Sequence, residues 1–299
     1  AAIATDTGTV TLDPAILKQL AELSGSELTI VIKAVDDSDL TDEERALTAG
    51  RPVADIKVLL DGKEIADFGG RTILAGIPYE AADTENHGNL IAIYLDGPDK
   101  GKPAKLSLYN HETKQMLFRT SHLSLYGVTY QNVTFGDIGN HWAKEGIEFL
   151  ASRDILKGKD NNRFDPDGSV TRAEFVTMLA NSMDGISVTG ARNAGFDDLS
   201  AGAWYTNYIN WAVEKGIVSG YGDGRFGPND KITREQMALM TENFIKAMES
   251  RPDVVKAKAE FADQAHISNW AKTAVARVQQ YGIINGNPDG TFASKATAT

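Results

Sequence analysis

The sequence predicts a multidomain chain in which an N-terminal all-β sandwich precedes a C-terminal all-α helical bundle. Up to residue 133, short apolar runs and alternations are separated by turn signals, which is typical of antiparallel strands. Beyond that point the apolar spacing becomes helical, and a set of landmark residues recurs three times in one register. A length of 299 residues fits this division into domains.

The N-terminal part is expected to form a β-sandwich with one short helix. Its predicted strands cover residues 8–12, 28–35, 53–60, 73–77, 90–95, 106–109 and 116–130. Asp61-Gly62 supplies the positive φ angles of a tight hairpin turn, and Gly69-Gly70 marks another turn. Residues 14–23 have helical apolar spacing, with Asp13 as the N-cap and Pro14 in the first turn.

The C-terminal part contains three copies of one unit, aligned on Trp142, Trp204 and Trp270. Each tryptophan follows a Phe-x-Asp and precedes an isoleucine, a glycine, a phenylalanine and a threonine at constant distances. The equivalent residues are Phe135, Phe196 and Phe261; Asp137, Asp198 and Asp263; Ile155, Ile217 and Ile283; Gly158, Gly220 and Gly286; Phe164, Phe226 and Phe292; and Thr171, Thr233 and Thr299.

Each copy is predicted to be a helix, a Gly/Asp/Pro-rich loop and a second helix. Thr171-Arg-Ala-Glu174 and Thr233-Arg-Glu-Gln236 are capping boxes that begin the second helix of copies one and two. One helix pair is too small to bury its own apolar face, so three copies are expected to share a pseudo-threefold core. The predicted domains are residues 1–133, 134–184, 195–249 and 260–299.

The pattern Phe-x-Asp, Trp-Ala, Ile-x-x-Gly, Asp-Gly-x-Phe, Pro and Thr-Arg-Ala-Glu resembles the S-layer homology (SLH) domain over residues 135–299. The resemblance implies a three-pronged module of a secreted bacterial protein in the cell wall or S-layer. It further implies binding of secondary cell-wall polysaccharide on peptidoglycan, often acidic and pyruvylated, in grooves between repeats. The third copy departs from the pattern, because it stops at Thr299 and has Ser294 where the others have Pro166 and Pro228.

Arg172 and Arg234 are the leading candidates for glycan contacts. A cation in the first turn of a helix opposes the helix dipole, so capping does not explain why arginine occurs twice. A guanidinium can hold a sugar carboxylate through two hydrogen bonds, with help from first-turn N–H groups. The structural alternative is a salt bridge to a neighbouring Asp or Glu.

The remaining candidates also have two interpretations each. Trp142, Trp204 and Trp270 suit stacking on sugar rings or anchoring a helix in the core, whereas Trp211 lies outside the register and is expected in the core. Asp137, Asp198 and Asp263 could accept bonds from sugar hydroxyls or cap helices. Gly158, Gly220 and Gly286 could cradle a ligand or permit a turn.

Composition excludes several function classes. The chain has no cysteine, so thiolate chemistry and Cys-ligated metals are excluded. A net charge of −11 argues against nucleic acid or an anionic membrane as a partner, and no apolar stretch is long enough to insert in one. The acidic loops lack calcium-loop spacing, and we expect no metal and no cofactor.

One short motif suggests a catalytic interpretation. The stretch 120–128 weakly resembles the self-cleaving segment of GAIN-type β-sandwiches, in which His122 would be the base and Ser124 the nucleophile at the Leu123–Ser124 bond. The main expectation is nonetheless a non-catalytic wall anchor that could also self-associate in a surface lattice. The chain could also be the C-terminal fragment of a secreted glycan-degrading enzyme, or a purely structural spacer.

Overall fold

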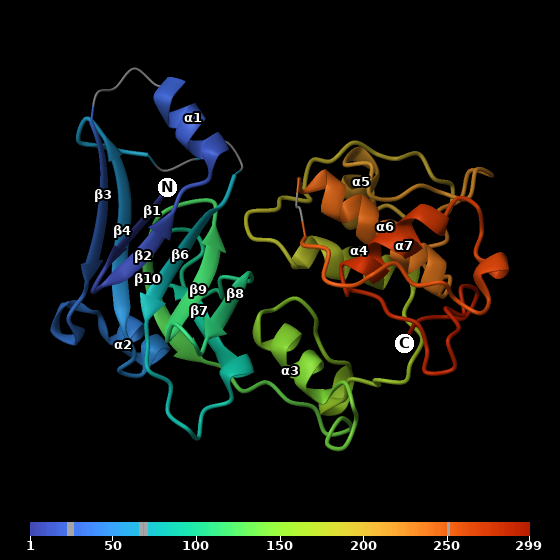
Figure 1. The fold of residues 1–299 in the computed structure, drawn as a ribbon, viewed down its shortest axis with the longest axis horizontal. Coiled ribbons are helices and arrows are strands. Elements are labelled where there is room, and N and C mark those ends of the chain that lie inside the picture. Colours follow the sequence, from blue (N-terminus) through green and yellow to red (C-terminus); the bar gives the residue numbers. More distant parts are fainter. Residues whose placement is uncertain (23–26, 66–67, 69–70, 250–251) are drawn as a thin grey trace. The chain divides into compact units, whose positions relative to one another are not determined.

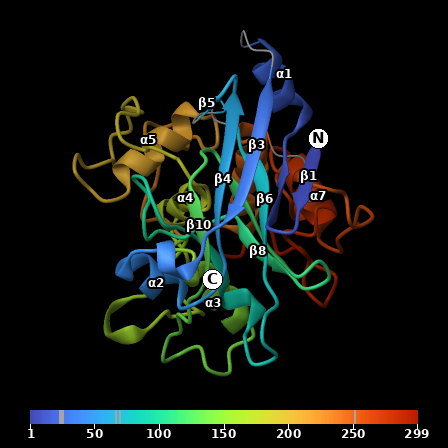
Figure 2. The ribbon, with the colours of Figure 1, turned by 90° about the vertical axis from the view of Figure 1, so that its left-hand side faces the viewer.

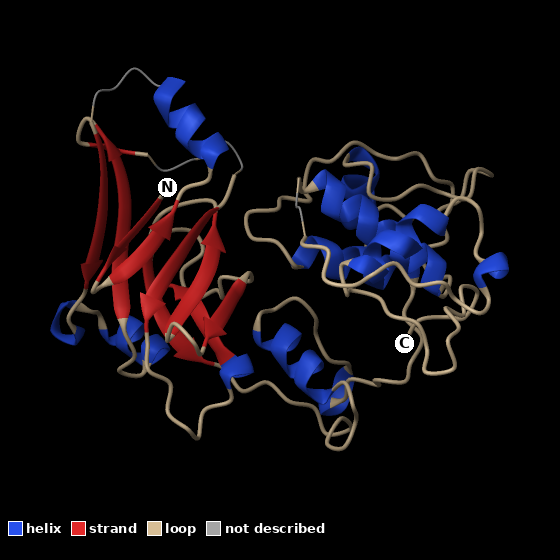
Figure 3. Ribbon diagram, viewed as in Figure 1, coloured by secondary structure: helices blue, strands red, loops and turns tan. Residues whose placement is uncertain are grey.

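The computed structural model describes residues 1–22, 27–65, 68, 71–249 and 252–299, so the predicted turn at Gly69-Gly70 lies outside the described residues. The chain forms two compact units. The first comprises residues 1–165 and 182–185, and the second comprises residues 166–181 and 186–299. The strands belong to the first unit, and the second contains helices and loops (Figures 1 and 3). None of the described helices has the length and apolar character needed to cross a membrane.

The first unit contains two antiparallel sheets (Figure 2). One has the strand order β1-β2-β6-β9-β8 and the other β3-β4-β10-β7, with β5 paired to β4. The strands are β1 (Ala2–Thr5), β2 (Gly8–Thr11), β3 (Leu28–Ala34), β4 (Val53–Leu60), β5 (Lys63–Glu64), β6 (Ile73–Pro78), β7 (Leu90–Tyr94), β8 (Ser107–Asn110), β9 (Gln115–Thr120) and β10 (Leu125–Tyr130). The predicted strand 116–130 is therefore two strands.

Alternating side chains of both sheets fill one apolar core. Val10 and Phe118 come from one sheet and Ile56 and Tyr126 from the other, and all are fully buried. Two local predictions are confirmed. The chain turns at Asp61 and Gly62, whose φ angles are 48° and 75°, so that β5 pairs with β4. The Asp13 carboxylate caps helix α1 (Pro14–Glu22) by accepting the Ile16 N–H at 2.7 Å.

Helix α2 (Asp42–Thr48) was not predicted, although its sequence carries a complete signal. Thr41 accepts the Glu44 N–H at 3.3 Å, and Glu44 accepts the Thr41 N–H at 2.8 Å. This reciprocal pair satisfies two N–H groups that a helix N-terminus leaves without partners. A search for the capping-box spacing before residue 134 could have found the helix.

The first helix of repeat one, α3 (Lys144–Ser152), also belongs to the first unit. It is fixed to the two-sheet part of this unit, residues 1–133, which we call the β-domain. The residue that fixes it is Arg153, which follows the helix and is fully buried. The Arg153 guanidinium donates to the carbonyls of Gly88, Leu90 and Ser107, at 2.8, 2.9 and 3.1 Å. Its charge also lies 3.7 Å from the centre of the Phe149 ring. Burial lowers the pKa of Arg153 to about 10.

Residues 182–185, which follow repeat one's second helix, return to the first unit. There Asp184 accepts the Lys105 N–H at 3.0 Å. Burial raises the pKa of Asp184 from 3.8 to about 6, even though this hydrogen bond favours the carboxylate. The folded chain therefore holds a proton between pH 3.8 and 6 that the unfolded chain releases, so the stability contributed by this group falls as the pH rises through that interval.

We expect Asp184→Asn to stabilise the first unit at pH 7, because the amide avoids burying a charge and its oxygen can still accept the Lys105 N–H. The free energy of unfolding should rise by about 1–3 kcal/mol at pH 7 and change little at pH 3.5. Urea unfolding of wild type and variant at both pH values measures this. An equal gain at both would contradict it.

The second unit contains α4 (Arg172–Asn181), α5 (Thr206–Glu214), α6 (Arg234–Ala247) and α7 (Lys272–Gln280). Helix α4 packs on α5, and α6 packs on α7. The second helix of one repeat therefore packs on the first helix of the next. Both predicted capping boxes are present: Glu174 with Thr171, and Gln236 with Thr233.

A ring of backbone hydrogen bonds joins the three repeats within this unit. The Val170 N–H donates to the Ala298 carbonyl at 3.0 Å, the Ala298 N–H to Ile232 at 2.9 Å, and the Ile232 N–H to Val170 at 2.9 Å. The three residues occupy the same repeat position, one residue before the threonine landmark. Each repeat thus gives one donor and one acceptor, so the ring requires all three.

Candidate functional site

The aspartates at the repeat starts fold the loops of all three copies in the same way. Asp137 accepts the N–H groups of Phe164 and Asp165, both at 2.8 Å. Asp198 does the same with Phe226 and Gly227, and Asp263 with Phe292 and Ala293, at 2.7–2.9 Å. The N–H groups of Phe164 and Asp165 hold the pKa of Asp137 below its ordinary value. The helix-capping interpretation is therefore wrong, because these carboxylates bind loop N–H groups.

The repeated glycines have a packing role. A Cβ on Gly220 would lie 2.3 Å from the Phe196 ring and 2.5 Å from the Arg225 carbonyl oxygen. Gly158 and Gly286 face the equivalent phenylalanines, Phe135 and Phe261, at 2.2 and 2.7 Å. These rings pack on the second phenylalanine of their repeat, with centroids 5.2–5.7 Å apart. The glycines therefore admit the aromatic pair that holds the loop.

Gly220→Ala is expected to destabilise the second unit by about 2–3 kcal/mol, because the added methyl overlaps a ring and a backbone oxygen. Gly222→Ala is the matched control: its φ is +88°, but no atom lies within 4 Å of the added methyl. It should cost only about 1 kcal/mol of backbone strain. Thermal unfolding of the two variants compares them, and equal losses would refute the packing role.

Arg172 fastens repeat one to repeat two. Its side chain is 3% exposed and crosses to the loop of the second copy. Nε donates to the Phe226 carbonyl at 2.9 Å and Nη2 to the Ser219 carbonyl at 3.1 Å. The guanidinium carbon lies 4.5 Å from the centre of the Phe226 ring and 4.7 Å from that of Tyr221. Burial lowers the pKa of Arg172 from its ordinary value.

Arg234 repeats this arrangement between repeats two and three. Nε donates to Phe292 at 2.8 Å and Nη2 to Asn285 at 2.7 Å, which are the same two carbonyl positions one repeat further on. Backbone bonds lie alongside: the Arg234 N–H donates to Ala296 at 2.9 Å, as the Arg172 N–H does to Asp230. We call these two contact regions, each centred on its arginine, the first seam and the second seam.

The structure thus places both arginines between repeats but changes their expected role. Neither forms the salt bridge of the structural alternative with any of the described residues; instead, backbone carbonyls accept hydrogen bonds from Nε and Nη2 of both. The Nε–Nη2 edge of each guanidinium therefore cannot bind a sugar carboxylate through two hydrogen bonds. Of the three nitrogens of each guanidinium, only Nη1 lacks a hydrogen-bond partner among the described residues. Hydrogen bonds to backbone carbonyls of the next repeat, which the sequence analysis did not consider, explain why a cation occurs in the first turn of each helix.

The three repeat tryptophans are exposed. Trp142, Trp204 and Trp270 are 88%, 59% and 52% accessible, and each lies two residues before its helix, α3, α5 or α7. The core-anchor interpretation is therefore wrong for all three. Trp211, outside the register, is 4% exposed and lies in the apolar core, as predicted. Equivalent positions thus display a large flat side chain to solvent in every copy.

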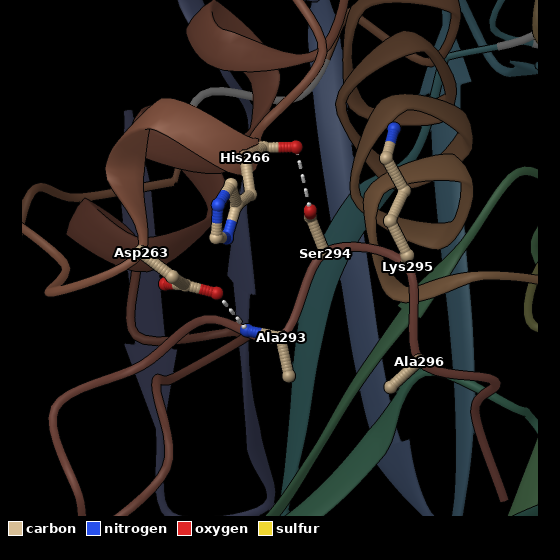
Figure 4. A pocket seen from close by; sticks show the side chains of 6 residues that line it. All are labelled: Asp263, His266, Ala293, Ser294, Lys295 and Ala296. Carbon is tan, nitrogen blue, oxygen red and sulfur yellow. Dashed lines mark hydrogen bonds between the residues drawn. The ribbon is translucent and has the colours of Figure 1, made fainter.

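The third copy carries a small open cavity of about 200 Å³, lined by Asp263, His266 and residues 293–296 (Figure 4). Ser294, which replaces the proline of the other copies, donates to the His266 carbonyl at 3.1 Å. Lys295 points away from Asp263 in this view, and its amine contacts Glu235 and Ser268. Among the described residues, no group of three or more His, Cys, Asp or Glu side chains could hold a metal ion.

The His122–Ser124 pair lacks the contact that self-cleavage requires. The Ser124 hydroxyl donates to Asp96, not to His122. His122 stacks on Tyr94, with centroids 4.8 Å apart, and its Nε2 lies 3.4 Å from the Asp99 carboxylate. A base that activates a serine must reach its hydroxyl. The geometry therefore corrects the catalytic interpretation, since each side chain faces an aspartate instead.

Comparison with known proteins supports the SLH resemblance. Residues 134–176, 195–238 and 260–299 match the family model of the S-layer homology domain. Exoglucanase XynX of Acetivibrio thermocellus is 40% identical over 58% of this chain and 16% of that protein. Amylopullulanase of Thermoanaerobacterium thermosulfurigenes is 37% identical over 61% of this chain and 10% of that protein. S-layer protein sap of Bacillus anthracis is 31% identical over 52% of this chain and 19% of that protein.

The three matched segments are S-layer homology repeats, and they form a cell-wall anchoring region. The chain is accordingly a secreted protein of the bacterial cell surface, associated with the wall. It spans only about a tenth to a fifth of the length of the relatives named above. The resemblance of the β-domain to GAIN-type sandwiches has no counterpart in these matches.

Proposed function

We propose that this chain anchors a surface protein non-covalently to the cell wall by binding secondary wall polysaccharide at the seams between its repeats. The single observation that carries the proposal is the exposure of Trp142, Trp204 and Trp270 at equivalent positions. A tryptophan offers a pyranose ring a flat apolar face and one N–H donor. Core packing cannot account for side chains that are half or more exposed.

Charge supports an acidic polysaccharide as the ligand. The chain carries a net charge of −11, so an anionic polymer needs local cations. At each seam the arginine keeps Nη1 without a protein partner among the described residues, beside the loop that its other nitrogens hold. We propose that Nη1 of Arg172 and Arg234 meets a sugar carboxylate, such as that of a pyruvyl group, and that the loops held by these arginines and the exposed tryptophans contact the sugar rings.

The repeats are proposed to act together as a pseudo-threefold assembly. The ring of Val170, Ile232 and Ala298 supports this symmetry, because each repeat has the same place in it. A single seam offers few contacts, so affinity for a long polymer would come from several seams on one strand. Self-association in a surface lattice would add further avidity.

Replacing the exposed tryptophans tests the proposal. Trp204→Ala and Trp270→Ala are each expected to weaken binding to purified cell walls about tenfold, because each removes a stacking face. The unfolding temperature should change little, since both side chains are exposed. Val255→Ala is the matched control, because Val255 is 65% exposed but belongs to the linker sequence that connects the second repeat to the third. Co-sedimentation with walls measures binding, and unchanged binding of both tryptophan variants would refute the proposal.

A second candidate is that the chain is the wall-anchoring part of a longer secreted glycan-degrading enzyme. It is favoured by two of the relatives named above, an exoglucanase and an amylopullulanase, of which the match covers only 16% and 10%. In that case the repeats would bind walls as proposed, and the catalytic groups would lie outside this sequence. Absence of glycan hydrolysis by this chain, with intact wall binding, is the expected result under both candidates.

A further inference from the structure

The two seams share one backbone arrangement but carry different side chains on their second helices. Helix α4 presents Ala173 and Ala180, which are buried at 0% and 3% exposure. Helix α6 has Glu235 and Glu242 at the same two positions, buried at 3% and 2%. The positions are seven residues apart and therefore lie on one face of each helix.

Both buried glutamates are paired with cations from the third repeat. Glu242 Oε1 lies 2.6 Å from Arg277 Nη1 on α7, and 3.2 Å from Lys246 Nζ of its own helix. Glu235 pairs with Lys295 Nζ. Glu235 also accepts the N–H and the hydroxyl of Ser268, at 3.0 and 3.1 Å. The second seam is thus held partly by charge.

The second repeat lacks cations at the matching positions. Trp211 stands where the third repeat has Arg277, and Asn229 stands where it has Lys295. Trp211 is 4% exposed and belongs to the same apolar cluster as Ala173 and Ala180. The first seam therefore joins small apolar residues to a large ring, whereas the second joins carboxylates to cations.

We propose that this difference determines which repeats can pair, so that α6 accepts the first half of repeat three and rejects that of repeat two. A repeat-two half placed on α6 would leave Glu235 and Glu242 buried with no cation from the partner, which is strongly unfavourable. A repeat-three half placed on α4 would bring Arg277 against Ala180 and leave the space of Trp211 unfilled. The repeats would then close in one order only.

The same rule would apply between molecules. Repeats of neighbouring chains at a crowded surface offer each other similar backbones, and similar elements can exchange between protomers. With this charge pattern, the second repeat of one chain is not accepted on α6 of another. The proposal concerns pairing of repeats and does not depend on any bound polysaccharide.

Variants of the full chain test the rule at the second seam. Arg277→Trp introduces the repeat-two residue opposite Glu242 and is expected to lower the unfolding temperature of the second unit by about 5–10 °C. Adding Glu242→Ala recreates the pair of the first seam and should recover at least half of that loss. The charge-swapped variant Glu242→Arg with Arg277→Glu should recover a similar share. Lys246→Ala, which removes only the exposed neighbour, should shift the temperature by less than about 2 °C.

The converse change tests the first seam. Ala180→Glu buries a carboxylate near Trp211 and should lower the unfolding temperature, and the addition of Trp211→Arg should recover part of the loss. Hydrogen exchange at the amides of Arg172 and Arg234 shows which seam has opened. The proposal would be overturned if the unfolding temperatures of both double variants and of the charge-swapped variant fell by the sum of the losses of their single variants, with no recovery.

Discussion

Arg153→Met is expected to lower the free energy of unfolding of the first unit by about 3–5 kcal/mol. The side chain is fully buried, and it is the donor for the carbonyls of Gly88, Leu90 and Ser107. Methionine fills similar space but donates nothing. Three backbone oxygens would then lose a partner, and two of them, those of Leu90 and Ser107, lie in buried hydrogen bonds that water cannot readily replace. This loss outweighs the gain from no longer burying a charge.

Lys215→Met is the control for this change. Lys215 occupies the same position at the end of α5, but it is exposed, so its replacement should cost less than about 0.5 kcal/mol. Urea unfolding, followed by the circular dichroism of strands and helices, measures the free energy of unfolding of both variants. If Arg153→Met left α3 protected from hydrogen exchange and cost no more than Lys215→Met, Arg153 would not be what fixes repeat one to the β-domain.

Arg172→Ala is expected to destabilise the second unit by about 3–4 kcal/mol. It removes two hydrogen bonds from a charged group and the contacts of that group with the Phe226 and Tyr221 rings. Arg172→Lys should recover little, because an ammonium cannot reach two carbonyls in the planar geometry of a guanidinium. Arg225→Ala is the control: its pair with Asp223 is on the surface and screened by solvent, so its removal should change the stability far less than Arg172→Ala.

This variant also separates two roles of the arginine. If Arg172 serves only as a fastener, wall binding should fall in proportion to the unfolded fraction and return when the variant is cooled below its unfolding transition. If Nη1 also holds a carboxylate, the fully folded variant should still bind about tenfold more weakly than wild type. Wild-type stability of Arg172→Ala would contradict the seam described above.

Much of the helical part could be predicted because its signals are local and repeated. The threonine and glutamate or glutamine of each capping box lie three residues apart, and the structure forms both boxes. Most strands were also predicted from their alternation. Helix α2 was missed because it has too few apolar residues to show a helical periodicity, although Thr41 and Glu44 carried the capping signal.

The role of the arginines could not be derived from sequence, because their partners are backbone carbonyls about fifty residues away, which leave no mark in residue type. Arg153 and Lys215 show the same limit, since equivalent cations at a helix end are buried in one repeat and exposed in the next. Tryptophan suits both a core and a sugar-binding surface. Its place outside the repeat register was enough to predict Trp211 in the core, but only the structure could show that Trp204 is exposed.

The most direct test is calorimetric titration of the full chain with secondary wall polysaccharide released from purified walls. We predict saturable binding that weakens at least tenfold when the carboxylates of the polysaccharide are reduced to alcohols. Failure to bind the native polysaccharide, together with undiminished sedimentation on walls stripped of it, would contradict the account.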